Sequence, residues 1–233
     1  MDSNAKGRRA RDSALAVAIA TLWTSRVGAA SGRLLVFLHV SAKQRALQSA
    51  LSDALPGVTV TAVGRIGDFD RALKDGTDAV LALPVVLAAK GLVVQVQGVR
   101  GGATDETYSL VAADNAPSPS DVKSVGAVDI LGRDGTNSFV QGLLGSQPKV
   151  ERVTKIEDLL PLLQVQTVET ILCPTRLVGE LKSVTKLTLA QTDLAKRVGL
   201  PALAIVGGPG ADVVGAVKQS TAAAKAVGVE SWK

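Results

Sequence analysis

Residues 132–139, GRDGTNSF, combine several side chains that can bind a ligand. Thr136, Asn137 and Ser138 carry hydroxyl and amide groups that form hydrogen bonds, and Gly135 lets a ligand approach the backbone. The stretch joins the apolar alternation VGAVDIL, an expected strand, to the apolar pattern VQGLL, an expected helix. A helix start offers free N–H groups and a positive dipole end to an anion. We predict an anion-binding loop here, although the same residues can also serve only to cap the helix.

Two further positions could contact the same ligand. Ser41 follows an expected strand, RLLVFLHV (33–40), and is a good N-cap for the helix behind it, yet this loop would also face a cleft between lobes. Arg176 stands two residues after Pro174 at the end of another expected strand. Its planar guanidinium group could pair with an oxyanion, or could simply be solvated at the surface. Lys43 and Arg133 are weaker candidates, and His39, inside an apolar strand, is interpreted as structural.

Motifs for catalysis are missing from the sequence. It contains no paired-carboxylate spacing, no Cys/His cluster, no G-x-S-x-G elbow and no Walker glycine loop. GVRGGATDE and GGPGAD are glycine-rich turns, but neither lies in the strand-rich unit that a nucleotide fold requires. We therefore expect a binding protein, not an enzyme, with no cofactor and no metal.

Composition supports a folded binding protein over a nucleic-acid binder. The 233 residues are 46% hydrophobic and 20% charged, enough to bury a full core, and only 3% are aromatic, too few for base-stacking platforms. The formal net charge is +5, but residues 1–30 carry five of the 26 basic residues and two of the 21 acidic ones. The rest of the chain therefore has a net charge of +2, which gives no reason to expect a nucleic-acid partner.

Residues 1–30 have the pattern of a signal peptide. A basic segment, MDSNAKGRRARD, precedes the apolar run SALAVAIATLW and the small residues VGAAS. An uncleaved membrane anchor is the alternative, but a span needs about 20 apolar residues and this run is much shorter. Cys173 is the only cysteine, so no internal disulfide can form. We predict an exported protein, periplasmic or otherwise outside the inner membrane, that is soluble after cleavage.

The remaining chain alternates strand-like and helix-like segments, which predicts an α/β fold of two lobes. Strand-to-helix units fill residues 33–84, and a similar pattern begins again at SVGAVDILG. The Pro/Ser-rich stretch DNAPSPSDV (114–122) is the predicted crossing between lobes. We expect residues 31–113 and 203–233 in lobe 1 and residues 114–202 in lobe 2. The chain should end in a strand, PALAIVGG, and one long helix.

The order of these segments resembles the type 2 periplasmic substrate-binding proteins of the phosphate and phosphonate class, which also includes sulfonate binders and transferrin-like lobes. Three stretches carry the resemblance: RIGDFDRALKDGTDAVLALPVVLAAKGL, TYSLVAADNAPSPSDVKSVGAVDILGRDGTNSF and PALAIVGGPGADVVGAVKQSTAAAKAVGVESW. It implies two mixed sheets flanked by helices, hinges near 111–121 and 188–202, and a small anion bound in the cleft. It also implies a monomer that delivers its ligand to a membrane permease.

The sequence departs from this family at the expected pocket. The family usually places an aromatic residue after the proline that ends the DAVLALP-like strand, and here Pro84 is followed by Val85. The stretch QTVETILCP lacks the Gly-x-x-Asp-Ala turn expected in the second lobe, and the usual pocket histidine of that lobe is absent. We still place Pro84 and Val85 in the predicted site. These departures also support a second hypothesis, a binding-protein fold without transport that acts as a sensor or protein-interaction module.

Overall fold

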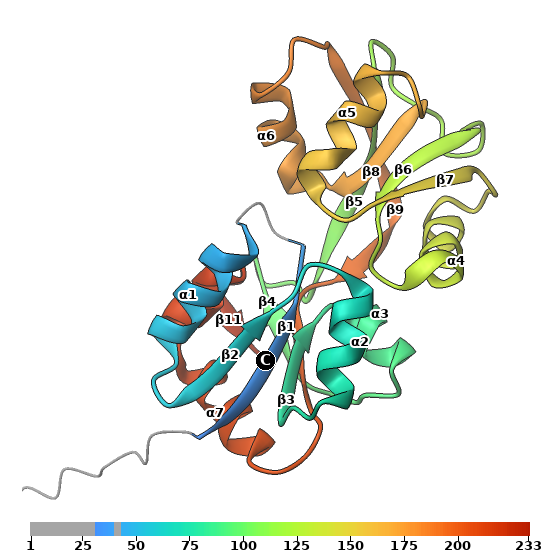
Figure 1. Ribbon diagram of the computed structural model, residues 1–233. Coiled ribbons are helices and arrows are strands. Elements are labelled where there is room, and N and C mark those ends of the chain that lie inside the picture. Colours follow the sequence, from blue (N-terminus) through green and yellow to red (C-terminus); the bar gives the residue numbers. More distant parts are fainter. Residues whose placement is uncertain (1–30, 40–42) are drawn as a thin grey trace, which may run out of the picture.

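The structure is a computed structural model that describes residues 31–39 and 43–233. These residues form two lobes, each built on one mixed sheet with helices on both faces (Figure 1). The strand order is β11-β4-β10-β3-β1-β2 in the first sheet and β7-β6-β8-β5-β9 in the second. The predicted two-lobed α/β fold class is therefore confirmed.

The first lobe is organised around β1, whose apolar side chains are buried on both faces of the sheet. Leu34 and Val36 face one helical layer, and Leu35 and Phe37 face the other. A continuous apolar run is what a central strand covered on both sides requires. The elements of this lobe are β1 (Gly32–Phe37), α1 (Gln44–Ala54), β2 (Val58–Ala62), α2 (Ile66–Lys74), β3 (Ala79–Ala82), α3 (Pro84–Ala89), β4 (Val94–Val99), β10 (Ala202–Ile205), α7 (Gly210–Gln219), α8 (Thr221–Ala226) and β11 (Ser231–Trp232).

The second lobe repeats this layering around β8 and β5. Helices α5 and α6 cover one face of its sheet, and α4 covers the other (Figure 1). Short 3₁₀ turns, η1 (Ile156–Asp158) and η2 (Thr175–Leu177), lead into α5 and α6. The remaining elements are β5 (Asp105–Ala113), β6 (Ser124–Val128), α4 (Gly132–Leu144), β7 (Lys149–Val153), α5 (Leu159–Gln164), β8 (Thr170–Pro174), α6 (Val178–Ser183) and β9 (Leu189–Gly199).

The chain crosses between the lobes at residues 100–104 and 200–201, not at the predicted Pro/Ser-rich stretch. Strand β5 pairs with β8 and β9, so it belongs to the second lobe. DNAPSPSDV is the loop from β5 to β6 within that lobe, and the predicted boundary at residue 114 and hinge at 111–121 are therefore wrong. Proline and serine mark a loop, but they do not say which sheets it joins. The second predicted hinge, 188–202, is mostly β9, and only its end is a crossing.

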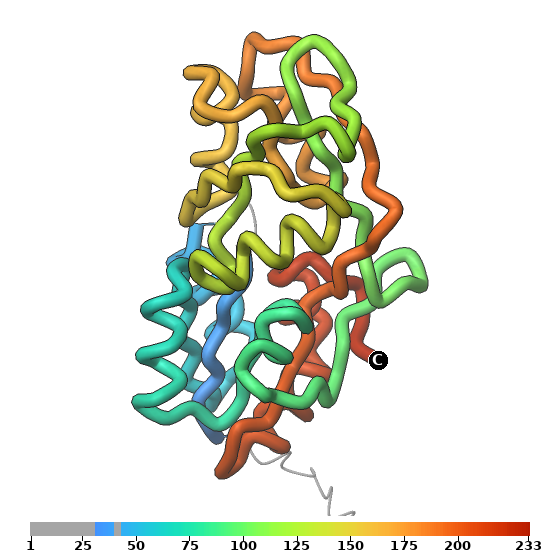
Figure 2. The backbone as a smooth tube through the Cα atoms, turned by 90° about the vertical axis from the view of Figure 1, so that its right-hand side faces the viewer, coloured from blue at the N-terminus to red at the C-terminus, as the bar shows by residue number. Residues whose placement is uncertain are grey.

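The two crossing segments lie side by side (Figure 2). The N–H of Leu200 and the side-chain amide of Gln97 both donate to the carbonyl oxygen of Thr104, each at 2.8 Å. An apolar contact also joins the lobes, because Ile130 of the second lobe packs in the cluster that contains Phe37 and Val86 of the first. The lobes are thus held together by both hydrogen bonds and apolar packing.

The predicted single C-terminal helix is two helices. Ser220 separates α7 from α8 with an extended backbone, and its hydroxyl oxygen accepts a hydrogen bond from the N–H of Ala223 at 3.1 Å. A serine cap of this kind starts a new helix because it pairs a backbone donor that the first turn leaves free. The last residues form β11 beside β4 instead of extending a helix.

The export prediction rests on residues 1–30, which lie outside the described residues. In residues 31–39 and 43–233, no helix is both long enough and apolar enough to cross a membrane.

Replacing Gly199 by alanine tests how tightly the crossing is packed. A Cβ atom at this position would lie 2.7 Å from Cγ of Pro84 and 3.0 Å from Nε2 of Gln97. We expect Gly199→Ala to lower the free energy of unfolding by roughly 1–3 kcal/mol, as overpacking does. Gly142→Ala is the control, because nothing lies within 4 Å of its Cβ position and alanine in a helix adds about 0.5–1 kcal/mol. Urea unfolding followed by circular dichroism measures both, and a Gly199→Ala protein as stable as the parent would contradict the packing argument.

Candidate functional site

Two adjoining hollows lie between the lobes and share His39 and Ile156 as lining residues. The inner pocket has a volume of about 40 Å³ and the outer cleft one of about 390 Å³. The outer cleft lies where β1, β2 and β7 end, since its walls include His39, Gly64 and Thr154. Loops at the carboxyl ends of strands are the usual place for ligands in open α/β sheets.

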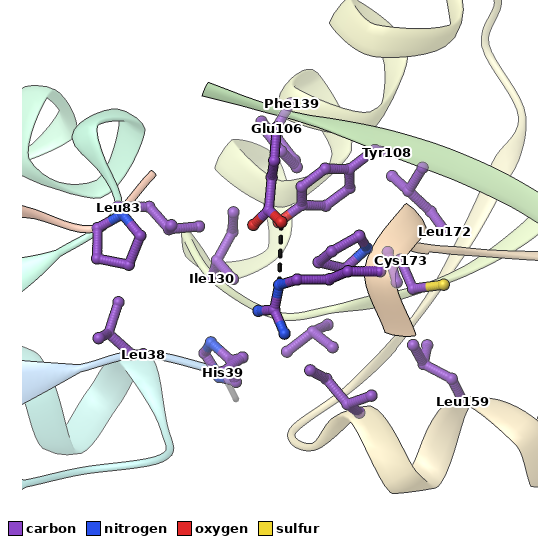
Figure 3. Close-up of a pocket in the computed structure, with 16 residues that line it drawn as sticks. Leu38, His39, Leu83, Glu106, Tyr108, Ile130, Phe139, Leu159, Leu172 and Cys173 are labelled. Carbon is purple, nitrogen blue, oxygen red and sulfur yellow. Dashed lines mark hydrogen bonds and ion pairs between the residues drawn. The ribbon is translucent and has the colours of Figure 1, made fainter. Parts of the chain in front are cut away.

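The inner pocket is lined mainly by apolar side chains from both lobes (Figure 3). Leu38 and Leu83 come from the first lobe, and Ile130 and Phe139 from the second. Tyr108 meets the Phe139 ring edge to face, with centroids 6.4 Å apart. A volume near 40 Å³ holds little more than water molecules. The apolar side chains therefore leave no room for a ligand the size of an amino acid in this pocket.

Glu106 neutralises much of the charge beside the inner pocket. Its Oε2 atom accepts hydrogen bonds from Nε of Arg176 at 3.0 Å and from Nη1 of Arg100 at 2.8 Å (Figure 3 shows the first). The Glu106 side chain is only 13% exposed, so these are strong, partly buried contacts. Arg176, a predicted site residue, does line the pocket, but its charge is already paired.

Burial keeps the other reactive side chains of the inner pocket neutral. It raises the pKa of the Cys173 thiol to about 12 and raises the pKa of the Tyr108 hydroxyl far above its ordinary value. A thiol with so high a pKa is not a nucleophile at neutral pH. Among the described residues, no group of three His, Cys, Asp or Glu side chains could hold a metal ion.

The outer cleft is polar and carries more positive than negative charge. Lys43 directly precedes α1 and Arg65 directly precedes α2, so both cations stand at helix N-termini, whose own partial charge is positive. The second lobe adds Lys155. Four cations and two carboxylates line the cleft in all. The full lining is His39, Lys43, Gln44, Arg45, Gly64, Arg65, Asp68, Thr154, Lys155, Ile156 and Glu157.

His39 stands at the junction of the two hollows. Burial lowers the pKa of its imidazole from 6.5 to about 4, although a hydrogen bond to the Gly64 backbone and the nearby Asp129 carboxylate oppose this shift. The ring is therefore neutral at pH 7. Its Nε2 atom is buried and contacts no hydrogen-bond partner in the described structure. The interpretation of His39 as a structural residue is incomplete, because it also lines the candidate site.

The structure places the predicted anion loop inside a helix. Helix α4 begins at Gly132, so Gly135, Thr136, Asn137 and Ser138 are helical residues, and none of them lines either hollow. Of these side chains, Thr136 is the one that bonds at the helix start. The buried Thr136 hydroxyl donates to Oδ1 of Asp129 at 2.8 Å and accepts from the Leu131 N–H at 3.0 Å.

The remaining predicted positions are scattered. Ser41 lies outside the described residues. Pro84 is the first residue of α3 and packs against the crossing, and Val85 is partly buried in the core of the first lobe; neither lines a hollow. Leu83, one residue earlier, reaches the inner pocket in their place. Lys43 lines the outer cleft, whereas Arg133 lines neither hollow.

Sequence reasoning missed Gln44, Arg45, Arg65 and Lys155. Each follows the end of an expected strand and stands near the start of a helix or 3₁₀ turn. That position was the available signal, because the carboxyl ends of strands from both lobes meet at one cleft. A surface lysine or arginine carries no further mark in the sequence.

Comparison with solved structures identifies the fold. XAC2383 from Xanthomonas citri bound to ATP aligns with a TM-score of 0.60 and 11% identity over 87% of this chain and 91% of that one. The periplasmic VFT2 domain of BvgS from Bordetella pertussis aligns with a TM-score of 0.55 and 11% identity over 85% and 92%. A mutant of arginine-bound ArgBP from T. maritima aligns with a TM-score of 0.54 and 13% identity over 81% and 95%.

These likenesses show the two-lobed type 2 periplasmic-binding-protein fold, which confirms that part of the predicted resemblance. They do not support the narrower phosphate and phosphonate class. No family model and no curated protein sequence matches the chain.

Protonation of His39 should make stability depend on pH. The pKa in the folded state is about 4 and that in the unfolded state is about 6.5, so only the unfolded chain gains a proton between these values. The free energy of unfolding should therefore fall by roughly 3 kcal/mol as the pH drops from 7 to 4. Because His39 is the only histidine in the sequence, one imidazole NMR signal reports the folded pKa directly. A midpoint near 6.5 would show that the ring is not desolvated.

Replacing Thr136 by valine tests its role in the helix start. The variant keeps the side-chain shape but leaves the Leu131 N–H and one Asp129 oxygen without their partner, so we expect a loss of about 1–3 kcal/mol. Ser138→Ala, at an exposed position of the same helix, should change stability by less than about 0.5 kcal/mol. Thermal unfolding of both variants distinguishes the two positions, and equal melting temperatures would contradict the assigned role.

Proposed function

We propose that this chain is an exported two-lobed solute-binding protein that binds a small anionic ligand in the outer cleft. The observation that carries the proposal is the charge of that cleft, where Lys43, Arg45, Arg65 and Lys155 outnumber Asp68 and Glu157. The volume of about 390 Å³ falls within the range of small-molecule sites, about 300–1,000 Å³. The proposal includes no catalytic step.

The four cations are available to a ligand. Within the described residues, none of them lies within 4 Å of a carboxylate in a salt bridge, whereas Arg176 and Arg100 are held by Glu106. Unpaired cations that line one concave surface raise the local concentration of anions and steer them inward. An anion would therefore meet positive charge in the outer cleft without first breaking an ion pair.

Both lobes contribute to this cleft. Lys43, Arg45 and Arg65 belong to the first lobe and Lys155 to the second. A ligand that contacts both sides binds the closed arrangement better than an open one and so favours closure. A membrane permease could then recognise the closed form of the monomer.

The filled inner pocket favours a second function. Apolar side chains from both lobes occupy the space that a deeper ligand would need. A domain of this kind could act as a sensor or protein-interaction module without carrying a solute. The same fold occurs in the periplasmic VFT2 domain of BvgS. Binding of a small ligand separates the two functions.

The test is thermal unfolding of the chain from Ser31 onward with phosphate, sulfate, phosphonates, sulfonates, phosphate esters including ATP, and amino acids. A ligand at a hundred times its dissociation constant should add about 2.7 kcal/mol to the free energy of unfolding. Arg65→Gln and Lys155→Gln should each weaken binding roughly fivefold, since one exposed charge contributes about 1 kcal/mol at contact distance. Raised salt concentration should weaken it as well.

Lys74→Gln provides the matched control. Lys74 is an exposed cation at the far end of α2 and does not line the cleft, so its loss should leave the affinity unchanged. If no anion stabilises the protein, the solute-binding proposal fails and the interaction module becomes the better account. If Lys74→Gln weakens binding as much as Arg65→Gln, the overall charge and not the cleft is responsible.

A further inference from the structure

Two residues that line the outer cleft each have a buried side-chain atom without a hydrogen-bond partner. Nε2 of His39 and Oε1 of Gln44 are both shielded from solvent and unpaired, and both residues line the cleft. Nearly all buried polar atoms in proteins have a hydrogen-bond partner, and each exception calls for an explanation. Two exceptions in one wall indicate that the wall is shaped for something that donates hydrogen bonds.

The hydrogen bonds of Gln44 determine which of its atoms is left over. Its Nε2 atom donates to the carbonyl oxygen of Leu38 at 3.0 Å. Only the amide nitrogen can make this bond, because a carbonyl oxygen is never a donor. The remaining atom, Oε1, is therefore an acceptor that lacks a donor.

The surroundings of His39 lead to the same conclusion. The Gly64 carbonyl favours a proton on the ring nitrogen that faces it, so in the neutral ring Nε2 is left as the acceptor. The Phe37 ring packs at 84° to the imidazole with centroids 4.9 Å apart, and Phe37 in turn stacks on Phe69 at 5.0 Å. This packing holds the imidazole plane in place. Nε2 is thus a fixed acceptor and not a freely rotating one.

Gly64 brings the two side chains together. A Cβ atom at Gly64 would lie 3.2 Å from Cγ and 3.5 Å from Nε2 of Gln44, so the absence of a side chain makes room for this amide. His39 bonds to the backbone of the same glycine. Arg65, one of the cleft cations, is the next residue, and Lys43 directly precedes Gln44. Two acceptors and two cations therefore share one end of the cleft.

We propose that His39 Nε2 and Gln44 Oε1 accept hydrogen bonds from an amino or hydroxyl group of the ligand, so that the ligand is a small anion that also carries a donor. This inference rests on the proposed anion binding and adds a specificity rule to it. A fully deprotonated oxyanion offers only acceptors and would leave both atoms unpaired. Sites of this type discriminate strongly, because the analogue without the donor leaves buried polar groups unsatisfied.

The experiment uses matched ligands that differ only in the donor. Calorimetric titration compares ethylphosphonate with 2-hydroxyethylphosphonate and 2-aminoethylphosphonate, and propanoate with 3-hydroxypropanoate and 3-aminopropanoate. We expect the members with a donor to bind at least about tenfold more tightly than the member without one, in whichever series binds. The two series also show whether a phosphonate or a carboxylate is preferred.

The variants His39→Phe and Gln44→Met remove one acceptor each at nearly constant size. Each should reduce the preference for the donor to within about threefold. Gln48→Met is the matched control, because Gln48 lies one turn further along α1 and its Oε1 atom is already paired with the Ala62 N–H at 3.0 Å. Circular dichroism checks that each variant is folded, and Gln44→Met alone suffices if His39→Phe is not.

The possible outcomes distinguish a failure of this inference from a failure of the proposed anion binding. If the plain anions bind as tightly as those with a donor, the specificity rule is overturned and anion binding stands. If both variants keep the preference for ligands with a donor, another part of the cleft accepts the hydrogen bond from that donor and the inference is also overturned. If no member of either series binds although another anion stabilises the protein, the inference is overturned and anion binding stands. Only if no anion at all stabilises the protein do the proposed function and the inference fail together.

Discussion

The carbonyl oxygen of Thr104, in one crossing segment, accepts hydrogen bonds from Leu200 in the other and from Gln97 in β4, and the candidate site depends on this junction. It pairs with the Leu200 N–H and with the Gln97 side chain, each at 2.8 Å. Arg100 ties the junction to Glu106 in the second lobe, and the Gly101 N–H ties it to Glu230 in the first at 3.0 Å. Within residues 31–39 and 43–233 the chain passes between the sheets only here. The junction therefore determines that the ends of β1 and β2 face the end of β7 across one cleft.

Whether a charged side chain in the two hollows has an ion-pair partner depends on its exposure to water. Beside the apolar inner pocket, one carboxylate, Glu106, compensates for Arg100 and Arg176, because an unpaired charge is costly where solvent is excluded. In the outer cleft Arg65 and Lys155 are exposed and need no partner, since water stabilises them. The consequence is that the positive charge beside the inner pocket is already paired. The charge that an anion can use lines the outer cleft.

The sequence predicts the individual strands and helices of this fold better than it predicts which strands pair in each sheet. The buried run RLLVFLHV and the strand DAVLALP are recognisable because a central strand is apolar throughout, whereas nothing in TYSLVAA says which sheet β5 joins. Strand β9 escaped prediction because a register shift opposite Thr107 and Ser109 breaks its alternation, and its buried residues are spaced irregularly. The site is harder still. The unpaired Nε2 atom of His39 depends on how the chain after β1 meets the residues around Gly64 and Asp129. No local pattern in the sequence predicts such a contact.

Packing between the lobes sets how much a ligand can change this molecule. Ile130 is only 5% exposed and shares an apolar cluster with Phe37 and Val86 of the other lobe, so opening the lobes would expose this surface to water. This contact therefore stabilises the described arrangement of the lobes even before a ligand binds. A ligand shifts an equilibrium only by its differential affinity for the two states, and here the apolar contact between the lobes is already formed without one. Entry through the outer cleft does not require the apolar contact to separate. Binding should consequently produce a small movement of the lobes and a clear gain in stability, so stability is the more sensitive measure of occupancy.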